Sequence, residues 1–167
     1  CSSTAIMVEV HQAAGAMAIY LAGTEEQKQK YLVPLAQGEK ICAFAITEPN
    51  FGSDAASIET TAVEDGDGFV INGQKMFITN GDIAEVFIVL AVTDKSLKAR
   101  GLTTFIVERN TPGFQVGRLE KKMGLRGTST AELTFEEMWV PRENVLGEVG
   151  EGFIIAMKTL DVARMVI

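Results

Sequence analysis

The sequence pattern changes near residue 40, and this change constrains the fold more than any other feature. From residue 41 to about residue 140, short runs of β-branched and aromatic residues alternate with turn residues. We expect strands at 41–46, 57–64, 68–72, 75–79, 86–93, 103–108, 114–119 and 131–140. Short strands at hairpin spacing predict an antiparallel β-barrel or sandwich of about one hundred residues.

Two turn sequences divide the first half of this region. They are Asp-Gly-Asp-Gly at 65–68 and Asn-Gly at 72–73. Asn-Gly is the strongest short hairpin signal, because both residues adopt positive φ more readily than others. We therefore expect residues 68–72 and 75–79 to be separate strands joined by a hairpin.

Helical patterns flank the strands. Residues 3–22 are mostly small or apolar and end before Gly23, and residues 25–37 follow a capping box of Thr24 and Gln27. Pro34 is expected to disrupt this second helix near its end. A third helix begins at Gly152, and its apolar face is expected to carry Phe153, Ala156, Met157, Leu160, Ala163 and Ile167.

The predicted fold class is α+β, with an antiparallel β-barrel middle domain between helical segments. We expect residues 1–40 to end an N-terminal α-helical domain, 41–146 to form the middle β-barrel domain and 147–167 to begin a C-terminal α-helical domain. The chain starts without Met and ends inside the third predicted helix, so we expect it to be a fragment with truncated α-domains.

Composition excludes some classes of partner. The net charge of −7 argues against a nucleic-acid surface, which needs a basic face. We see no apolar run near the roughly 20 residues that span a bilayer, and expect no membrane contact. Cys1 and Cys42 form neither a disulfide framework nor a metal-binding spacing, so we expect no metal and reduced, intracellular surroundings.

The stretch 41–56 is the strongest candidate for a site. An apolar run opens into a loop that carries Gly52, Ser53 and Asp54. Backbone N–H groups and hydroxyls at the edge of a sheet suit ligands with phosphates or ring carbonyls. The same residues are also common in ordinary turns, and the loop alone leaves both interpretations open.

Other polar residues have simpler interpretations. His11, the only histidine, is expected to be a surface or packing residue, because no partner motif points at it. Asp161 and Arg164 lie three residues apart on a predicted helix and could form a surface ion pair. Two basic loops suit either an anion or solvent, and their cations are Lys95, Lys98, Arg100, Lys121, Lys122 and Arg126.

Several stretches together resemble the acyl-CoA dehydrogenase family, in family order along nearly the whole chain. They are G-T-E-E-Q-K-Q-K-Y-L at 23–32, F-A-I-T-E-P-N-F-G-S-D at 44–54, I-N-G-Q-K-M-F-I-T-N-G at 71–81, K-M-G-L-R-G-T-S-T at 122–130, V-P-R-E-N-V-L-G at 140–147 and G-F-I-I-A-M-K-T-L-D-V-A-R at 152–164. The D-K-S-L-K loop at 94–98 and F-I-T-N-G are most similar to the short-chain, butyryl-type members.

The resemblance implies a homotetrameric FAD enzyme that oxidises an acyl-CoA thioester to the trans-2-enoyl-CoA. In this family a carboxylate removes the α-proton, the β-hydride passes to flavin N5, and an electron-transfer flavoprotein takes the electrons. Such an enzyme is expected in the cytoplasm of a bacterium or the mitochondrial matrix of a eukaryote.

The resemblance also assigns site residues. The cofactor-binding set is Phe44, Ile46, Thr47, Gly52, Ser53, Phe77, Ile78 and Thr79. Thr47 and backbone donors are expected at the flavin pyrimidine edge and Thr79 near N5. Phe77 either covers a flavin face or, read from sequence alone, is a core aromatic. Ser53, Asp161 and Arg164 match substrate positions, and Lys98 to Arg100 would lie near the nucleotide phosphates.

Departures from the family pattern leave alternatives open. Phe51 stands where the family has a small residue, and it could narrow the pocket or point outward. In most members the catalytic glutamate follows residue 167, and the isovaleryl-type position is Ala163 here, so the catalytic residue is unknown and the fragment alone is expected to be inactive. Glu48 is expected to fix its loop by hydrogen bonding. An inactive binding or assembly module and an enoyl-CoA reductase are the alternatives.

Overall fold

The computed structural model describes residues 1–165. Ile167, expected on the apolar face of the last helix, lies outside the described residues. Two helical rods begin the chain, as the sequence predicts. The first is α1 (Ser2–Glu9), η1 (Val10–Ala16) and α2 (Met17–Ala22), and the second is α3 (Glu25–Gln27), η2 (Lys28–Leu32) and α4 (Val33–Ala36). Both η1 and η2 are π-helical, and the backbone stays helical through each junction.

The start of the second rod confirms the predicted capping box. The Gln27 amide N–H donates to Thr24 Oγ1 at 3.2 Å, and the Thr24 N–H donates to Gln27 Oε1 at 3.0 Å. The prediction that Pro34 disrupts the helix is wrong. Pro34 lies inside the second rod, directly after the π-helical η2, and the helix continues past it to Ala36.

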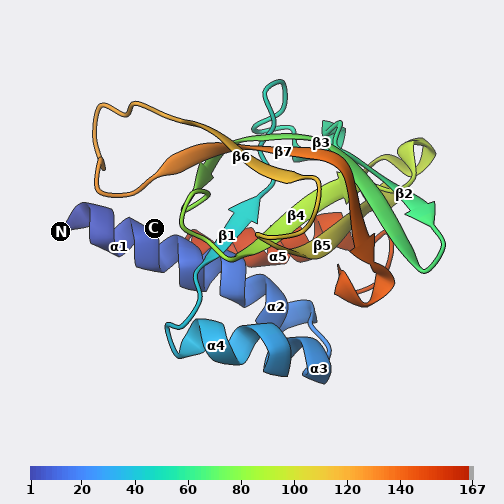
Figure 1. Cartoon of the computed structure of the whole chain (residues 1–167), viewed down its shortest axis with the longest axis horizontal. Helices are drawn as coiled ribbons and strands as arrows, with labels where there is room; N and C mark the ends of the chain where they lie inside the picture. The colour runs from blue at the N-terminus through green and yellow to red at the C-terminus, as the bar shows by residue number, and fades with distance from the viewer. Residues whose placement is uncertain (166–167) are drawn as a thin grey trace.

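Eight strands form one sheet beside these rods (Figure 1). They are β1 (Cys42–Ala45), β2 (Thr61–Asp65), β3 (Gly68–Thr79), β4 (Val86–Val92), β5 (Leu102–Glu108), β6 (Phe114–Leu119), β7 (Thr130–Pro141) and β8 (Val145–Leu146). Short 3₁₀ turns η3 (Ala55–Ser57), η4 (Lys95–Gly101) and η5 (Arg142–Asn144) lie between them, and α5 (Gly152–Ala163) ends the described elements.

The sheet corrects the predicted antiparallel barrel. Its order is β6-β7-β3-β2-β4-β5-β8, with β1 pairing β4 off this path. The sheet is not closed, and it is mixed, because β1 and β2 each run parallel to β4 while the other pairs are antiparallel. The chain leaves β1 through a long loop and builds β2 and β3 before it places β4 beside β1. Such a crossover allows a parallel pair, whereas a tight hairpin does not.

The predicted hairpin at Asn72-Gly73 is also wrong, because β3 runs unbroken through both residues. The register against β7 shifts between Ile71 and Gly73, which marks a β-bulge. Gly73 has φ +151°, and a Cβ there would lie 2.6 Å from Thr60 Oγ1. Asn72 bonds the opposite strand, accepting from the Glu137 N–H at 2.8 Å. The glycine therefore serves a close backbone approach rather than a turn.

The core lies inside the curve of the sheet and between the sheet and the helices. Phe69, Phe87, Phe105 and Phe135 are at most 1% exposed, and the rings of Phe69 and Phe105 meet edge to face at 5.1 Å. On the helical side, η1 packs on β1, and α5 packs on both η1 and β5. A Cβ at Gly15 of η1 would lie 2.6 Å from Cys42 Cβ, so glycine lets this helix lie directly on β1.

The first helical rod contradicts the prediction that no apolar run approaches the length that spans a bilayer. Residues Ser2–Ala22 are long and apolar enough to cross a membrane, with a hydropathy of 1.3 over the most apolar 18-residue window. Small apolar residues spread along the rod give it this value. A core helix of a soluble protein and an N-terminal signal sequence pass the same test; here 28% of the window is buried, and η1 packs on β1 and α5.

Candidate functional site

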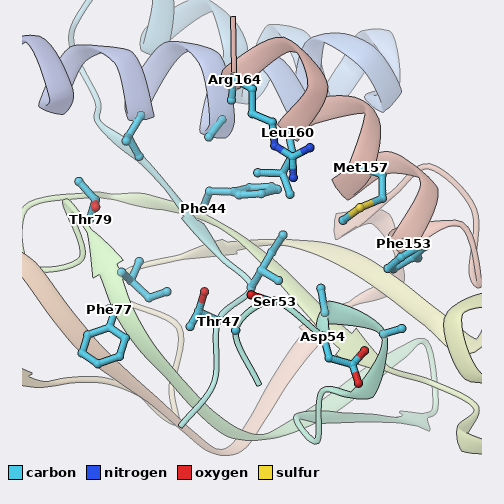
Figure 2. Close-up of a pocket in the computed structure, with 18 residues that line it drawn as sticks. Phe44, Thr47, Ser53, Asp54, Phe77, Thr79, Phe153, Met157, Leu160 and Arg164 are labelled. Carbon is cyan, nitrogen blue, oxygen red and sulfur yellow. The ribbon is translucent and has the colours of Figure 1, made fainter. Parts of the chain in front are cut away.

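A cavity of about 400 Å³ lies where η1, β1 with its following loop, the end of β3 and α5 meet (Figure 2). Its lining residues are Val10, Ala14, Phe44, Ile46, Thr47, Gly52, Ser53, Asp54, Ala55, Ala56, Phe77, Ile78, Thr79, Phe153, Met157, Leu160, Ala163 and Arg164. We call residues 46–60 and 75–79 the cavity rim. The walls are mostly apolar, and hydroxyls mark the rim.

The structure brings together all eight residues assigned to the cofactor from the sequence. Phe44, Ile46, Thr47, Gly52, Ser53, Phe77, Ile78 and Thr79 all line this one cavity. Two of the three substrate residues, Ser53 and Arg164, also line it, whereas Asp161 is not among the lining residues. Segments more than a hundred residues apart in sequence thus form one concave surface, and their roles in binding stay predictions.

The loop after β1 supplies the polar side of the cavity. Figure 2 shows Thr47 and Ser53 near its centre, below the ring of Phe44. Gly52 lines the cavity too, and a Cβ added there would have no atom within 4 Å. The protein's own packing therefore does not require glycine at 52, but a Cβ would occupy open space beside the loop.

The end of β3 supplies the opposite side of the rim through a distorted strand. The register against β7 shifts between Lys75 and Ile78, and Phe77 within this bulge has φ +59°. A positive φ at a bulky residue is strained, and such strain gathers at functional sites. Phe77 is 56% exposed, so the interpretation of it as a core aromatic is wrong.

A buried ion pair fastens the two sides of the rim to each other. Lys75 Nζ donates to Glu48 Oε1 at 2.8 Å and to the Ile46 carbonyl at 3.0 Å. The Glu48 carboxylate also accepts from the backbone N–H groups of Glu59, at 2.6 Å, and Thr60, at 3.0 Å. The prediction that Glu48 fixes its loop by hydrogen bonding is confirmed.

Burial and mutual attraction act in opposite directions on this pair. Burial lowers the pKa of Lys75 to about 8, although the Glu48 carboxylate opposes this change. Burial alone would raise the pKa of Glu48, but the Lys75 ammonium and the hydrogen bonds from Lys75, Thr60 and Glu59 hold that pKa below its usual value. Glu48 is therefore an anion with its hydrogen-bonding positions occupied, which does not suit a catalytic base.

Helix α5 closes the cavity with an apolar face. Phe153, Met157 and Leu160 point from it toward the β1 loop (Figure 2). At its end, Arg164 Nη1 lies 4.0 Å from Asp161 Oδ1, and the two side chains are 73% and 78% exposed. An exposed pair at this distance contributes little stability. Both charged groups are therefore accessible to a ligand.

Phe51, the residue that departs from the family pattern, does not line the cavity. It is half-buried and packs against the apolar cluster that contains Ile46, Ile58 and Leu90. Its backbone exchanges two hydrogen bonds with Glu48, at 2.9 Å and 3.2 Å. Phe51 thus anchors the β1 loop to the core, and neither alternative drawn from the sequence describes it.

His11 is a packing residue, as expected. Its Nδ1 accepts from the Cys42 N–H at 3.0 Å, and its Nε2 lies 3.2 Å from the Leu35 carbonyl. The ring therefore joins both helical rods to the start of β1. In one of the two basic loops, Lys122 Nζ donates to Thr128 Oγ1 at 2.7 Å. One of the cations of this loop therefore stabilises the loop itself. Anion binding by either loop stays a prediction.

Sequence reasoning missed several lining residues and the ion pair. Phe153, Met157, Leu160 and Ala163 were expected on one helix face, and that shared face was the available signal for the cavity. Residues 54–56 fall within the candidate stretch 41–56, whereas Val10 and Ala14 gave no comparable signal. Lys75 also gave none, because a lysine in a strand is usually exposed.

The lining limits what the described residues can do chemically. Asp54 and Arg164 are the lining residues with ionisable side chains, and Asp54 Oδ2 accepts from the Ser57 hydroxyl at 2.6 Å. Among residues 1–165, no group of three or more His, Cys, Asp or Glu could hold a metal ion. The arrangement suits a ligand with an apolar surface and a polar edge, and we assign no catalytic base.

Comparison with known proteins identifies the family. Residues 1–39 match the family model of the acyl-CoA dehydrogenase N-terminal domain, and residues 43–138 match that of the middle domain. The short-chain specific acyl-CoA dehydrogenase of Clostridium acetobutylicum is 51% identical over 165 residues, which are 99% of this chain and 44% of that protein. The chain belongs to the acyl-CoA dehydrogenase family, and it spans less than half of this relative's length.

Solved structures agree in fold. One solved chain comes from a structural study of the electron transferring flavoprotein of Acidaminococcus fermentans. It superposes with a TM-score of 0.97 at 50% identity, over 98% of this chain and 43% of that one. An acyl-CoA dehydrogenase complexed with FAD from Bacillus anthracis superposes with a TM-score of 0.90 at 45% identity, over 96% of this chain and 27% of that one.

Proposed function

We propose that this chain is the flavin-binding part of an FAD-dependent acyl-CoA dehydrogenase that acts on short-chain acyl-CoA. The observation that carries the proposal is the single cavity lined by all eight residues assigned to the cofactor from the sequence. The short-chain specific relative from Clostridium acetobutylicum supports the substrate class.

The residues of the cavity fit FAD. Thr47 and Thr79 offer hydroxyls on opposite sides of the rim, Gly52 leaves open space where a side chain would project, and Phe77 offers an exposed aromatic ring. Hydroxyls and backbone donors suit the polar edge of a flavin, and apolar walls suit its ring system. Bound there, FAD would supply the acceptor for the substrate hydride.

The accessible end of α5 fits the CoA part of the substrate. Arg164 lines the cavity, and Asp161 lies outside it on the same helix. Arg164 would hold an anionic or carbonyl oxygen near the cavity, Ser53 would contact the acyl thioester region, and Asp161 would accept from amide N–H groups further out. These contacts would orient the acyl chain and exclude water from it.

We propose an electron-transfer flavoprotein as the redox partner and a homotetramer as the assembly. The related chain from the Acidaminococcus fermentans structure supports the partner. We also propose that residues 1–40, 41–146 and 147–167 belong to successive domains of a longer protein, located in the cytoplasm of a bacterium or the mitochondrial matrix of a eukaryote.

A reductase of the same family is the second candidate. The acryloyl-CoA reductase (NADH) of Anaerotignum propionicum is 46% identical over 167 residues, 99% of this chain and 42% of that protein. The cavity would serve either direction, because the same groups hold cofactor and acyl chain in both.

The test uses the full-length protein that contains this segment. It is titrated with FAD and then with butyryl-CoA under anaerobic conditions, while the flavin absorbance is followed. Bleaching of the oxidised flavin band by butyryl-CoA is expected for the dehydrogenase. Reduction of the bound flavin by NADH, followed by its reoxidation by an enoyl-CoA, would favour the reductase. Failure to bind FAD would refute both.

A further inference from the structure

The cavity rim rests on a pair of charges that the proposed function does not explain. Among residues 1–165, Lys75 and Glu48 form the one ion pair in which both side chains are buried, with 0% and 4% exposure. Burying an ion pair seldom stabilises a fold more than apolar residues of similar volume would. The pair therefore calls for an explanation other than stability.

The position of the pair suggests that explanation. Lys75 directly precedes the bulge that exposes Phe77, and its ammonium reaches the Ile46 carbonyl and the Glu48 carboxylate on either side of Thr47. The next residue, Met76, donates its backbone N–H to the Thr47 carbonyl at 2.8 Å. Thr47 is thus held at its own carbonyl and through both neighbours by two consecutive residues of β3.

The far end of the loop is held by the same carboxylate. Glu48 accepts from the N–H groups of Glu59 and Thr60, which close the loop that carries Gly52 and Ser53. On the strand opposite, Leu133 pairs with Lys75, and Glu48 is the charged group that acts on the ammonium. The ion pair therefore joins both sides of the rim, next to the backbone bond from Met76 to Thr47.

We propose that Lys75 and Glu48 are positioning residues for the cofactor, holding the Thr47–Ser53 loop and the Phe77–Thr79 bulge at a fixed separation. This inference rests on the proposed function, since the ligand at the rim is FAD. Neither Lys75 nor Glu48 lines the cavity, and the pair acts through Ile46, Thr47 and the bulge. Its loss would widen the rim and reduce FAD affinity in a protein that still folds.

The test compares two variants of the full-length protein. K75M removes the ammonium and keeps an unbranched side chain that is one heavy atom shorter. V107A truncates a fully buried core residue that does not line the cavity, and so lowers stability without touching the rim. For each folded variant, the FAD dissociation constant is measured by flavin fluorescence, and backbone amide hydrogen exchange is measured without FAD.

For K75M we expect the FAD dissociation constant to rise at least tenfold, with an altered visible spectrum of the bound flavin. We also expect the amides of Glu59, Thr60 and Met76 to exchange at least tenfold faster. V107A should leave FAD affinity and the flavin spectrum unchanged. FAD affinity of K75M within twofold of wild type would overturn the proposal, because the pair would then be merely structural.

If K75M fails to fold, two further measurements test the proposal. E48Q keeps a carbonyl oxygen for the loop amides but removes the charge, and it should also raise the FAD dissociation constant. In the wild type, the amides of Glu59, Thr60 and Met76 should open in one event with one free energy, and independent opening would overturn the proposal. A wild type that takes up no FAD would refute the proposed function, while the exchange data would still test the coupling.

Discussion

Strands β4 and β5 belong to the same sheet as the 75–79 side of the cavity rim, but the backbones of the two regions are held in different ways. The strands β4 and β5 pair in unbroken register from Val86 opposite Glu108 to Val92 opposite Leu102, and nearly all their side chains are buried. The rim carries a register shift, a positive φ at Phe77 and a buried ion pair. Regular pairing gives stability to the first region, and specific polar contacts give shape to the second.

This difference predicts that substitutions in the two regions separate stability from binding. Truncation in β4 and β5 should lower the free energy of unfolding and leave the cavity intact. Substitution of a lining hydroxyl should weaken FAD binding and leave the free energy of unfolding unchanged. The predictions below test the separation in order of expected effect.

The largest effect is expected for F87A in β4. Phe87 is fully buried and contacts Phe114 with ring centroids 4.7 Å apart. Removing a core phenyl ring should cost about 3–5 kcal/mol of unfolding free energy. Urea denaturation of the full-length protein measures this loss. FAD affinity at temperatures where the variant is folded should match the wild type, and a parallel loss of affinity would break the proposed separation.

G73A should have an intermediate effect, and it should lower both the free energy of unfolding and the affinity for FAD. At φ +151° a Cβ would lie 2.6 Å from Thr60 Oγ1, and the Thr60 N–H is bonded to Glu48. Strain and displacement of Thr60 should cost about 1–3 kcal/mol of unfolding free energy and weaken FAD binding. G52A is the matched control: it should leave the melting temperature unchanged and lower only FAD affinity, because its Cβ would face open space.

T47V should act on binding alone. The Thr47 hydroxyl lies at the rim, and its loss should cost about 1–2 kcal/mol of FAD binding free energy, roughly tenfold in affinity. Flavin fluorescence titration measures this change. T61V serves as the control, because Thr61 is exposed on β2 and does not line the cavity. Equal affinities for T47V and wild type would remove Thr47 from the proposed site.

The last prediction concerns pH. Burial lowers the pKa of Lys75 from 10.5 to about 8, so that the folded protein binds fewer protons than the unfolded chain between these values. Lys75 should therefore make the folded state more stable as pH rises from about 8 to 10.5. Urea denaturation of wild type and K75M across this range isolates the term as a difference. A constant difference between the two proteins would contradict the lowered pKa.

The sequence predicted the regular region well and the rim only in part. Strand β6 has the predicted bounds, β4 and β5 differ from prediction by one residue, and both helical rods and α5 were expected, because period and caps are local signals. The mixed sheet was not predicted, since parallel pairing of β1 with β4 depends on contacts between distant segments.

The failures at the rim and just before it, at Asn72-Gly73, have a shared physical cause. Asn72-Gly73 has the composition of a hairpin, but the close approach of Thr60 uses the glycine within a continuous strand. From the sequence, Phe77 resembles a core aromatic and Lys75 resembles a surface lysine. In the structure Phe77 is exposed at the bulge and Lys75 is buried beside it. A local pattern does not show a bulge that tertiary contacts impose. The resemblance to a family predicted cofactor residues there, but not the pair beneath them.

The most direct test of the central claim is a crystal structure of the full-length protein grown with FAD. The account predicts the isoalloxazine ring in the cavity between Thr47–Ser53 and Phe77–Thr79, with α5 on its other side and the Lys75–Glu48 contact intact beneath it. A flavin bound outside this cavity, or a cavity that closes in the FAD complex, would contradict the account.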